Sequence, residues 1–243
     1  MIACLPMYDR PALRWATDQL WEAIATGLKN RGIDAPESLS RDADYTRMWN
    51  NPDLLLGMTC GKPYREGLHH NRVLVGNYDY GLEGCPPGFY NSHIIVNASA
   101  DLACLAECAG LRFCYNGDNS ESGFACVRRM VGDLDVFCGA QMVSGGHQKS
   151  VEMVVAGEAD FAAIDASTWR YMLADDSELT SRVKIIDSTD PVPGLPFITA
   201  HGDLVEPLAE AAVEALATAP EATAALHIVG FVKIGHDDYC AVT

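Results

Sequence analysis

Short, continuously apolar segments alternate with amphipathic segments along most of this chain. The apolar segment 2–8 is followed by segment 11–32, which places Leu13, Leu20, Ile24 and Leu28 on one helical face and ends at Gly32. Further strand-like segments, including 53–59, 72–80, 111–116, 135–143 and 160–166, are separated by helical segments. Strands that are apolar on both faces are typical of sheets covered by helices on both sides. The pattern therefore predicts an α/β fold with mainly parallel sheets.

The charge balance and the hydropathy pattern exclude two classes of partner. The chain has 33 Asp and Glu against 17 Lys and Arg, a formal net charge of −16, so we expect no nucleic-acid binding. No apolar run reaches the roughly 18 to 20 residues of a membrane span, so we expect no membrane insertion. Segment 2–8 reads as a strand and has no signal peptide before it. We expect a cytoplasmic protein, or a periplasmic one if a leader has been removed.

The cysteines favour neither a metal site nor a cofactor site. Most of the nine lie in apolar segments, where Cys acts as a small buried side chain, and no zinc-ligand spacing occurs. The sequence has no P-loop and no dinucleotide fingerprint. Cys60 and Cys85 lie in Gly- and Pro-rich loops that follow predicted strands. If the protein is exported, these two residues could form a disulfide; the alternative is that they are two unrelated loop thiols.

Two turns rich in small polar residues come directly after predicted strands and before predicted helices. The first turn, 116–123, reads "NGDNSESG", and the second, 144–147, reads "SGGH". Free backbone N–H groups at a helix start can bind an anion, and Gly and Ser let it approach closely. Asp118 and Glu121 also fit a capping box that needs no ligand, and His147 fits a structural side chain equally well. Each turn is therefore either a helix cap or a ligand-binding turn.

Several motifs in the second half of the chain together resemble a known family. The segments "YNGDNSESG" (115–123), "GGHQKSVEMVVAGEADFAAIDASTW" (145–169) and "PVPGLPFIT" (191–199) occur in this order. They resemble the substrate-binding proteins of phosphate, phosphite and phosphonate ABC transporters. The segments "LPMYDR" (5–10) and "TCGKPY" (59–64) extend the resemblance more loosely toward the N-terminus.

The resemblance implies a type 2 periplasmic-binding-protein fold, which has two α/β lobes and a ligand cleft between them. Proteins of this architecture close around their ligand by hinge motion. Mapped onto this sequence, one lobe comprises residues 1–93 and 191–243, and the other comprises residues 94–190. The chain then crosses between lobes near 91–99 and near 187–196.

The resemblance also implies a set of ligand-binding residues. The family's Ser/Thr turn at a helix N-terminus falls on Ser120 and Ser122, with Glu121 and Gly123 in the same turn. Its histidine falls on His147, beside Gly146, and its acidic ligand-orienting residue falls on Asp165. Aromatic contacts from the first lobe fall on Tyr8, Tyr64 and Tyr90.

One residue departs from the family pattern. Phosphonate binders commonly have Ser-Thr-Ser-Gly where this chain has Ser120-Glu121-Ser122-Gly123. A Glu121 carboxylate that faces the ligand would repel a dianion and favour an amine-bearing ligand. A carboxylate that faces outward would instead complement the helix dipole and cap the helix.

Three functions are compatible with these residues. The first is a monomeric solute-binding protein that captures a small polar, anionic ligand, such as a phosphonate or phosphate, for an ABC permease, without catalysis. The second is an intracellular enzyme or sensor on the same two-lobed fold, with His147 as acid, base or nucleophile and Cys60 as a thiol. The third is a binding protein without a transport partner. The sequence contains no recognisable motif that pairs a nucleophile with a base, so no motif supports the enzyme alternative.

Overall fold

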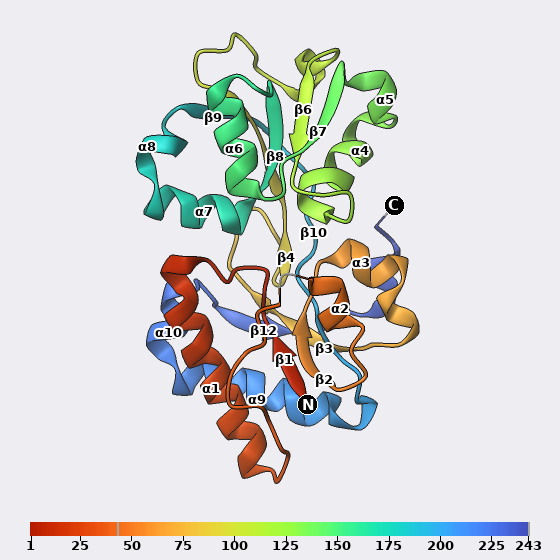
Figure 1. The fold of residues 1–243 in the computed structure, drawn as a ribbon, viewed down its shortest axis with the longest axis vertical. Helices are drawn as coiled ribbons and strands as arrows, with labels where there is room; N and C mark the ends of the chain where they lie inside the picture. Colours follow the sequence, from red (N-terminus) through yellow and green to blue (C-terminus); the bar gives the residue numbers. More distant parts are fainter. Residues whose placement is uncertain (43, 243) are drawn as a thin grey trace. The chain divides into compact units, whose positions relative to one another are not determined.

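The computed structural model describes residues 1–42 and 44–242, and the chain divides into two compact units. Unit 1 consists of Met1–Phe89 and Pro193–Val242, and unit 2 of Tyr90–Val192 (Figure 1). The short strands at the two crossings, β4 (Phe89–Tyr90) and β10 (Val192–Pro193), pair with each other. The first crossing precedes the boundary predicted at 93/94, because the whole of the next strand belongs to the sheet of unit 2.

Unit 1 is built on a five-stranded sheet with the order β1-β2-β11-β3-β12. Strand β11 comes from the C-terminal part of the chain, yet it pairs with β2 on one side and with β3 on the other. Both pairings are antiparallel, whereas β1 and β2 are parallel. The strands are β1 (Ile2–Cys4), β2 (Leu54–Met58), β3 (Val73–Asp79), β11 (Phe197–Thr199) and β12 (Gly230–Val232).

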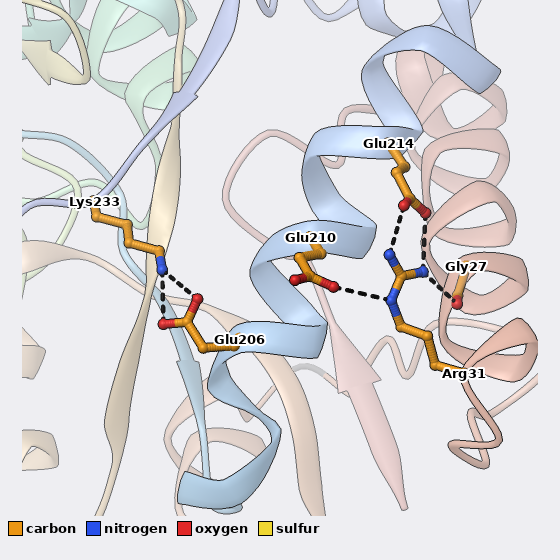
Figure 2. A network of polar contacts seen from close by, with 6 residues as sticks. All are labelled: Gly27, Arg31, Glu206, Glu210, Glu214 and Lys233. Carbon is orange, nitrogen blue, oxygen red and sulfur yellow. Dashed lines mark hydrogen bonds and ion pairs between the residues drawn. The ribbon is translucent and has the colours of Figure 1, made fainter.

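The helices of unit 1 come from both of its chain segments. The long helices α1 and α9 pack closely, since a Cβ atom added at Gly27 would lie 3.3 Å from the Ala211 Cβ. At the end of α1, Arg31 donates to Glu210 and Glu214 on α9 (Figure 2). The helices are α1 (Arg14–Asn30), α2 (Tyr45–Trp49), α3 (Gly61–Glu66), α9 (Val205–Thr218), α10 (Pro220–Ala225) and α11 (His236–Cys240), with 3-10 turns η1 (Pro11–Leu13), η2 (Leu68–His70) and η5 (Gly202–Leu204).

Unit 2 has its own five-stranded sheet, with the order β7-β6-β8-β5-β9. Strand β6 pairs in parallel with both β7 and β8, whereas β5 is antiparallel to β8 and β9. The strands are β5 (Ser92–Asn97), β6 (Arg112–Tyr115), β7 (Ala140–Val143), β8 (Phe161–Asp165) and β9 (Val183–Ser188). The helices are α4 (Cys126–Val131), α5 (Leu134–Phe137), α6 (His147–Ala156), α7 (Ala166–Asp175) and α8 (Ser177–Thr180), with short turns η3 (Leu105–Cys108) and η4 (Glu121–Ala125).

Both sheets are mixed, which corrects the expectation that they are mainly parallel. In each unit the first strand after a crossing, β5 in unit 2 and β11 in unit 1, runs antiparallel to both of its neighbours. These strands lie inside the sheets and not at their edges. The predicted α/β class with two lobes is confirmed, and the strand direction at the crossings explains the difference.

The central strands of unit 2, β5, β6 and β8, bury both faces of their sheet, whereas the edge strands β7 and β9 are partly exposed. Because successive side chains of a strand point to opposite faces, Phe113 and Cys114 on β6 belong to different cores. Phe113 packs with Val127 of α4 and Leu134 of α5, whereas Cys114 packs with residues of α6 and α7. Helices on the two sides of the sheet are visible in Figure 1. The sheet is therefore rigidly held, and its strand ends are fixed positions.

Segment 135–143 differs from the single strand that its apolar residues predict. Its first part is the helical turn α5, and only Ala140–Val143 forms strand β7. Asp133 caps the turn by accepting a hydrogen bond from the Asp135 N–H at 2.9 Å. The capping Asp stabilises a helical start that the apolar pattern does not reveal.

We expect Gly76→Ala to destabilise unit 1. Gly76 lies in β3 with a φ of +147°, and an added Cβ would lie 2.4 Å from the Phe231 ring and 2.8 Å from the Val232 carbonyl oxygen. Backbone strain and overpacking together should cost about 2 kcal/mol or more. Urea unfolding measures the change. Gly67→Ala is the matched control, because φ is −171° there and nothing lies within 4 Å of an added Cβ. Equal stability of the two variants would contradict the packing of β12 on β3.

Candidate functional site

Three helical segments of unit 2 begin directly after three neighbouring parallel strands. The turn η4 follows β6, α6 follows β7, and α7 follows β8 (Figure 1). Because the three strands are parallel, their carboxyl ends lie at one edge of the sheet. Ligands of α/β proteins bind at such edges, where helix N-termini offer free N–H groups. This edge carries the predicted residues Ser120, Ser122, His147 and Asp165.

The first predicted turn is a helix cap, and its capping residue is Ser120. The Ser120 hydroxyl accepts a hydrogen bond from the Gly123 N–H at 2.9 Å, and the Ser120 carbonyl accepts from the Ala125 N–H at 3.1 Å. The five-residue spacing of the second bond makes η4 a single π-helical turn, a feature frequent at functional sites. The Asp118 carboxylate accepts a hydrogen bond from the Tyr115 hydroxyl at 2.9 Å. The capping box of Asp118 and Glu121 stays a prediction.

Ser122 and His147 meet across two different helix starts. The Ser122 Oγ lies 3.0 Å from the His147 Nε2, within hydrogen-bond distance. Ser122 is buried, and the Nδ1 atom of His147 is also covered, although part of the residue's surface is exposed. The two turns that the sequence singles out separately thus form one polar cluster.

His147 is held in its neutral form. Burial lowers its pKa from an ordinary value near 6.5 to about 4, because a charged imidazolium would lose its hydration. The backbone of Ala163 opposes this shift weakly. Burial is the larger of the two effects, so the pKa stays low. A neutral imidazole offers one N–H donor and one acceptor nitrogen.

The second turn is fixed by its first residue, Ser144, to which the sequence assigns no separate role. The Ser144 Oγ lies 2.7 Å from the Ser150 Oγ and donates to the Tyr115 carbonyl at 3.1 Å. It also accepts a hydrogen bond from the Gly146 N–H at 3.4 Å. Ser144 therefore connects the end of β6 to the start of α6 and positions His147. The spacing of Ser144 and Ser150 carries no local pattern that predicts this contact.

Glu121 forms a buried ion pair with Arg129. The Arg129 Nη1 donates to the Glu121 Oε1, and the Glu121 side chain is only 1% exposed. The sequence suggests a Glu121 side chain that faces either the ligand or outward as a cap. Neither orientation anticipates the pairing with Arg129. Arg129 lies eight residues later, on α4, beyond the spacing at which helical neighbours are expected.

Gly123 allows a close approach between η4 and the end of β6. An added Cβ at Gly123 would lie 1.9 Å from the Asn116 Oδ1. That oxygen is buried and has no hydrogen-bond partner among the described residues. Glycine is therefore required here by space, because the amide of Asn116 occupies the volume of a side chain.

Asp165 lies at the end of β8 and caps α7. Its carboxylate accepts a hydrogen bond from the Thr168 N–H at 2.7 Å, and the residue is 3% exposed. In the sheet it is paired with Ser92 of β5, whose N–H donates to the Thr189 Oγ1 at 3.0 Å. The structure thus brings Asp165 to the same strand-end edge as Ser122 and His147.

The remaining predicted residues lie elsewhere. Tyr8 and Tyr64 belong to unit 1, and Tyr90 is the first residue of unit 2; all three are buried. The Tyr64 hydroxyl is 3.1 Å from the His236 Nδ1. Cys60 and Cys85 are not joined by a disulfide in the structure. Among residues 1–42 and 44–242, no group of three His, Cys, Asp or Glu side chains could hold a metal ion.

The sequence matches a known family over most of its length. Residues 22–239 match the family described as ABC transporter, phosphonate, periplasmic substrate-binding protein. The chain belongs to this family. A search of curated proteins finds no match. The family consists of substrate-binding proteins and not of enzymes. In the described part of the chain, no helix has the length and hydrophobicity needed to span a membrane.

Solved structures share the fold of this phosphonate-family protein at low sequence identity. PhnD1 from Prochlorococcus marinus, in complex with methylphosphonate, is 16% identical, with a TM-score of 0.74 over 99% of this chain and 95% of PhnD1. The phosphonate transporter binding protein of Pseudomonas aeruginosa is 15% identical, with a TM-score of 0.71 over 98% and 82% of the chains. The aliphatic sulphonate binding protein SsuA from Escherichia coli is 14% identical, with a TM-score of 0.65 over 99% and 87%. These likenesses show the two-lobed periplasmic-binding-protein fold.

We expect the stability of the protein to fall in acid because of His147. Its folded-state pKa is depressed, so its contribution to stability is complete above the unfolded-state value near 6.5 and is lost as the pH falls from 6.5 toward 4. Between pH 6.5 and 5 the loss should be up to about 2 kcal/mol. His147→Gln should remove this part of the acid sensitivity in urea unfolding at several pH values. The control is His70→Gln at an exposed position. An identical acid response in wild type and His147→Gln would contradict the burial of the imidazole.

Proposed function

We propose that this protein captures a small phosphonate or phosphate-like anion at the β6-β7-β8 edge of unit 2. The observation that carries the proposal is the contact between Ser122 and His147, which joins two helix starts at 3.0 Å. The N-terminal ends of helices supply positive potential that the acidic chain otherwise lacks. Neutral hydrogen-bond donors at such ends bind an oxyanion without adding a charged side chain.

The proposed contacts are the hydroxyl of Ser122, the N–H groups around Glu121 and Ser122, and the imidazole of His147. The Ser120 hydroxyl and the Gly123 N–H bond each other, so they support the turn. Asp165 is proposed to accept a hydrogen bond from a protonated part of the ligand, and Gly146 to contribute backbone. The aromatic contacts to the ligand predicted for Tyr8, Tyr64 and Tyr90 remain part of this proposal.

Family membership supports a transport role for the bound ligand. A periplasmic substrate-binding protein delivers its ligand to an ABC permease, and we propose that this chain does so as a monomer in the periplasm. The ligand class follows from the family description and from PhnD1, which was solved with methylphosphonate. Residues 1–89 with 193–242 and residues 90–192 are the proposed lobes.

A catalytic role is less well supported by the same residues. The distance from Ser122 to His147 suits a nucleophile and its base, and this favours the enzyme alternative. However, among the described residues no side chain forms a hydrogen bond with the His147 Nδ1, so no third side chain completes a triad. A pKa near 4 also makes His147 a weak base at neutral pH. We therefore propose binding without catalysis.

Substitutions in the proposed site should weaken ligand binding and leave the fold intact. Ser122→Ala and His147→Ala each remove one hydrogen bond to an anion, which typically costs about 1.5 to 3 kcal/mol, or roughly 10- to 150-fold in affinity. Calorimetric titration with methylphosphonate and with phosphate measures the change. Ser181→Ala, at an exposed serine of the same unit, is the control. Unchanged affinity in both site variants would reduce the two turns to helix caps.

A further inference from the structure

The Glu121 carboxylate poses a problem for an anion-binding turn. Glu121 lies between Ser120 and Ser122 in the sequence, and its side chain is only 1% exposed. A charged group that is removed from water needs a compensating partner. An uncompensated carboxylate at this place would also repel a phosphonate or phosphate. Its partner therefore decides whether the turn can bind an anion at all.

Arg129 supplies the compensating charge from further along the same helical segment. The two residues are eight positions apart, which corresponds to a rise of about 12 Å in a regular helix. Because Arg129 lies C-terminal to Glu121, its side chain reaches back toward the N-terminus of the segment to make this contact. Side chains of a helix lean toward its N-terminus, which suits the direction of Arg129. The ion pair thus gives the carboxylate a cationic partner within the protein.

Cys126 lies between Glu121 and Arg129 on the same helical segment. The Cys126 thiol donates a hydrogen bond to the Ser122 carbonyl at 2.7 Å, so the thiol contacts the backbone of the turn. Burial raises the pKa of this thiol to about 12, and among the smaller effects the Arg129 charge lowers it and the Glu121 charge raises it. Cys126 thus lies in sequence between the two members of the ion pair, and its thiol contacts the turn that contains Ser122.

We propose that Arg129 is a positioning residue that neutralises Glu121 and so makes this Glu-containing turn competent to bind an anion. The proposal rests on the proposed function. The pair has no net charge, so it leaves the positive potential of the helix starts intact. The carboxylate is also occupied, so it does not recruit an amino group. The ligand class that follows is a simple oxyanion, such as an alkylphosphonate or phosphate, without a required cationic group.

A double-mutant cycle tests the proposal by changing the net charge of the pair. Arg129→Met gives the pair a net charge of −1, Glu121→Gln gives it a net charge of +1, and the double variant restores a net charge of zero. A unit charge about 8 Å from a bound anion, at an effective dielectric constant near 20, changes affinity by roughly 30-fold. With methylphosphonate and with phosphate in calorimetric titration, we expect Arg129→Met to bind 10- to 30-fold more weakly and Glu121→Gln more tightly by a similar factor. The double variant should return to within threefold of wild type.

The matched control removes a neighbouring positive charge from the same helix. Arg128 is exposed, so Arg128→Met should bind within threefold of wild type. Arg129→Lys keeps the charge and should also bind nearly as wild type does. If Arg129→Met does not fold, the comparison of Glu121→Gln with the double variant decides, because neither leaves a buried carboxylate unpaired. A 10- to 30-fold tighter affinity of Glu121→Gln supports the proposal, and equal affinities overturn it.

Other outcomes would also overturn the proposal. A double variant as weak as Arg129→Met would show that Arg129 binds the anion itself. An affinity of Arg129→Met equal to wild type would show that the pair does not act on the site. Equal losses in Arg128→Met and Arg129→Met would show an effect of overall charge. If wild type binds neither probe, the proposed function fails and this inference fails with it; binding by wild type without coupling overturns this inference alone.

Discussion

The parallel alignment of β6, β7 and β8 is the constraint on which the candidate site depends. It places three strand ends at one edge of the sheet, and the helical segments that follow begin there. Strands β6 and β8 are held by side chains buried on both faces of the sheet. Strand β7 is more exposed, but the helix α6 that follows it packs on the core through Val151 and Val154. Residues as distant as Ser122 and His147 can then form one hydrogen bond. Local capping alone would leave them in two unrelated turns.

The sequence predicts the elements of this arrangement better than the contacts within it. Helix α6 begins and ends where His147 and Gly157 indicate, because a left-handed Gly ends the helix. The convergence of Ser122 and His147 also follows from the order of strands and turns. The pairing of Glu121 with Arg129, however, depends on a π-helical turn and on two extended side chains, and no periodic pattern signals either. The directions of β5 and β11 depend likewise on tertiary pairing, which an apolar strand does not specify.

Electrostatics explains how an acidic chain can hold an anion site. The protein carries a net charge of −16, yet the candidate site contains a neutral histidine, hydroxyl groups and helix starts. Two carboxylates at this edge have partners within the protein: Glu121 pairs with Arg129, and Asp165 accepts a hydrogen bond from the N-terminus of α7. Short-range donors therefore determine the local potential, and the distant acidic surface is screened by salt. The surface charge influences solubility and association more than the affinity of a buried oxyanion.

The position of β11 has a consequence for how the chain folds during synthesis. The sheet of unit 1 needs β11 between β2 and β3, but β11 leaves the ribosome only after all of unit 2. The first 89 residues therefore cannot complete their sheet early, and they must wait with unpaired strand edges. Unit 2 is continuous in sequence and can fold as soon as it emerges. The sheet of unit 2 can therefore form from one continuous segment, whereas the sheet of unit 1 closes only when the C-terminal segment supplies β11. Until then, the edges of β2 and β3 that face β11 expose unpaired backbone groups.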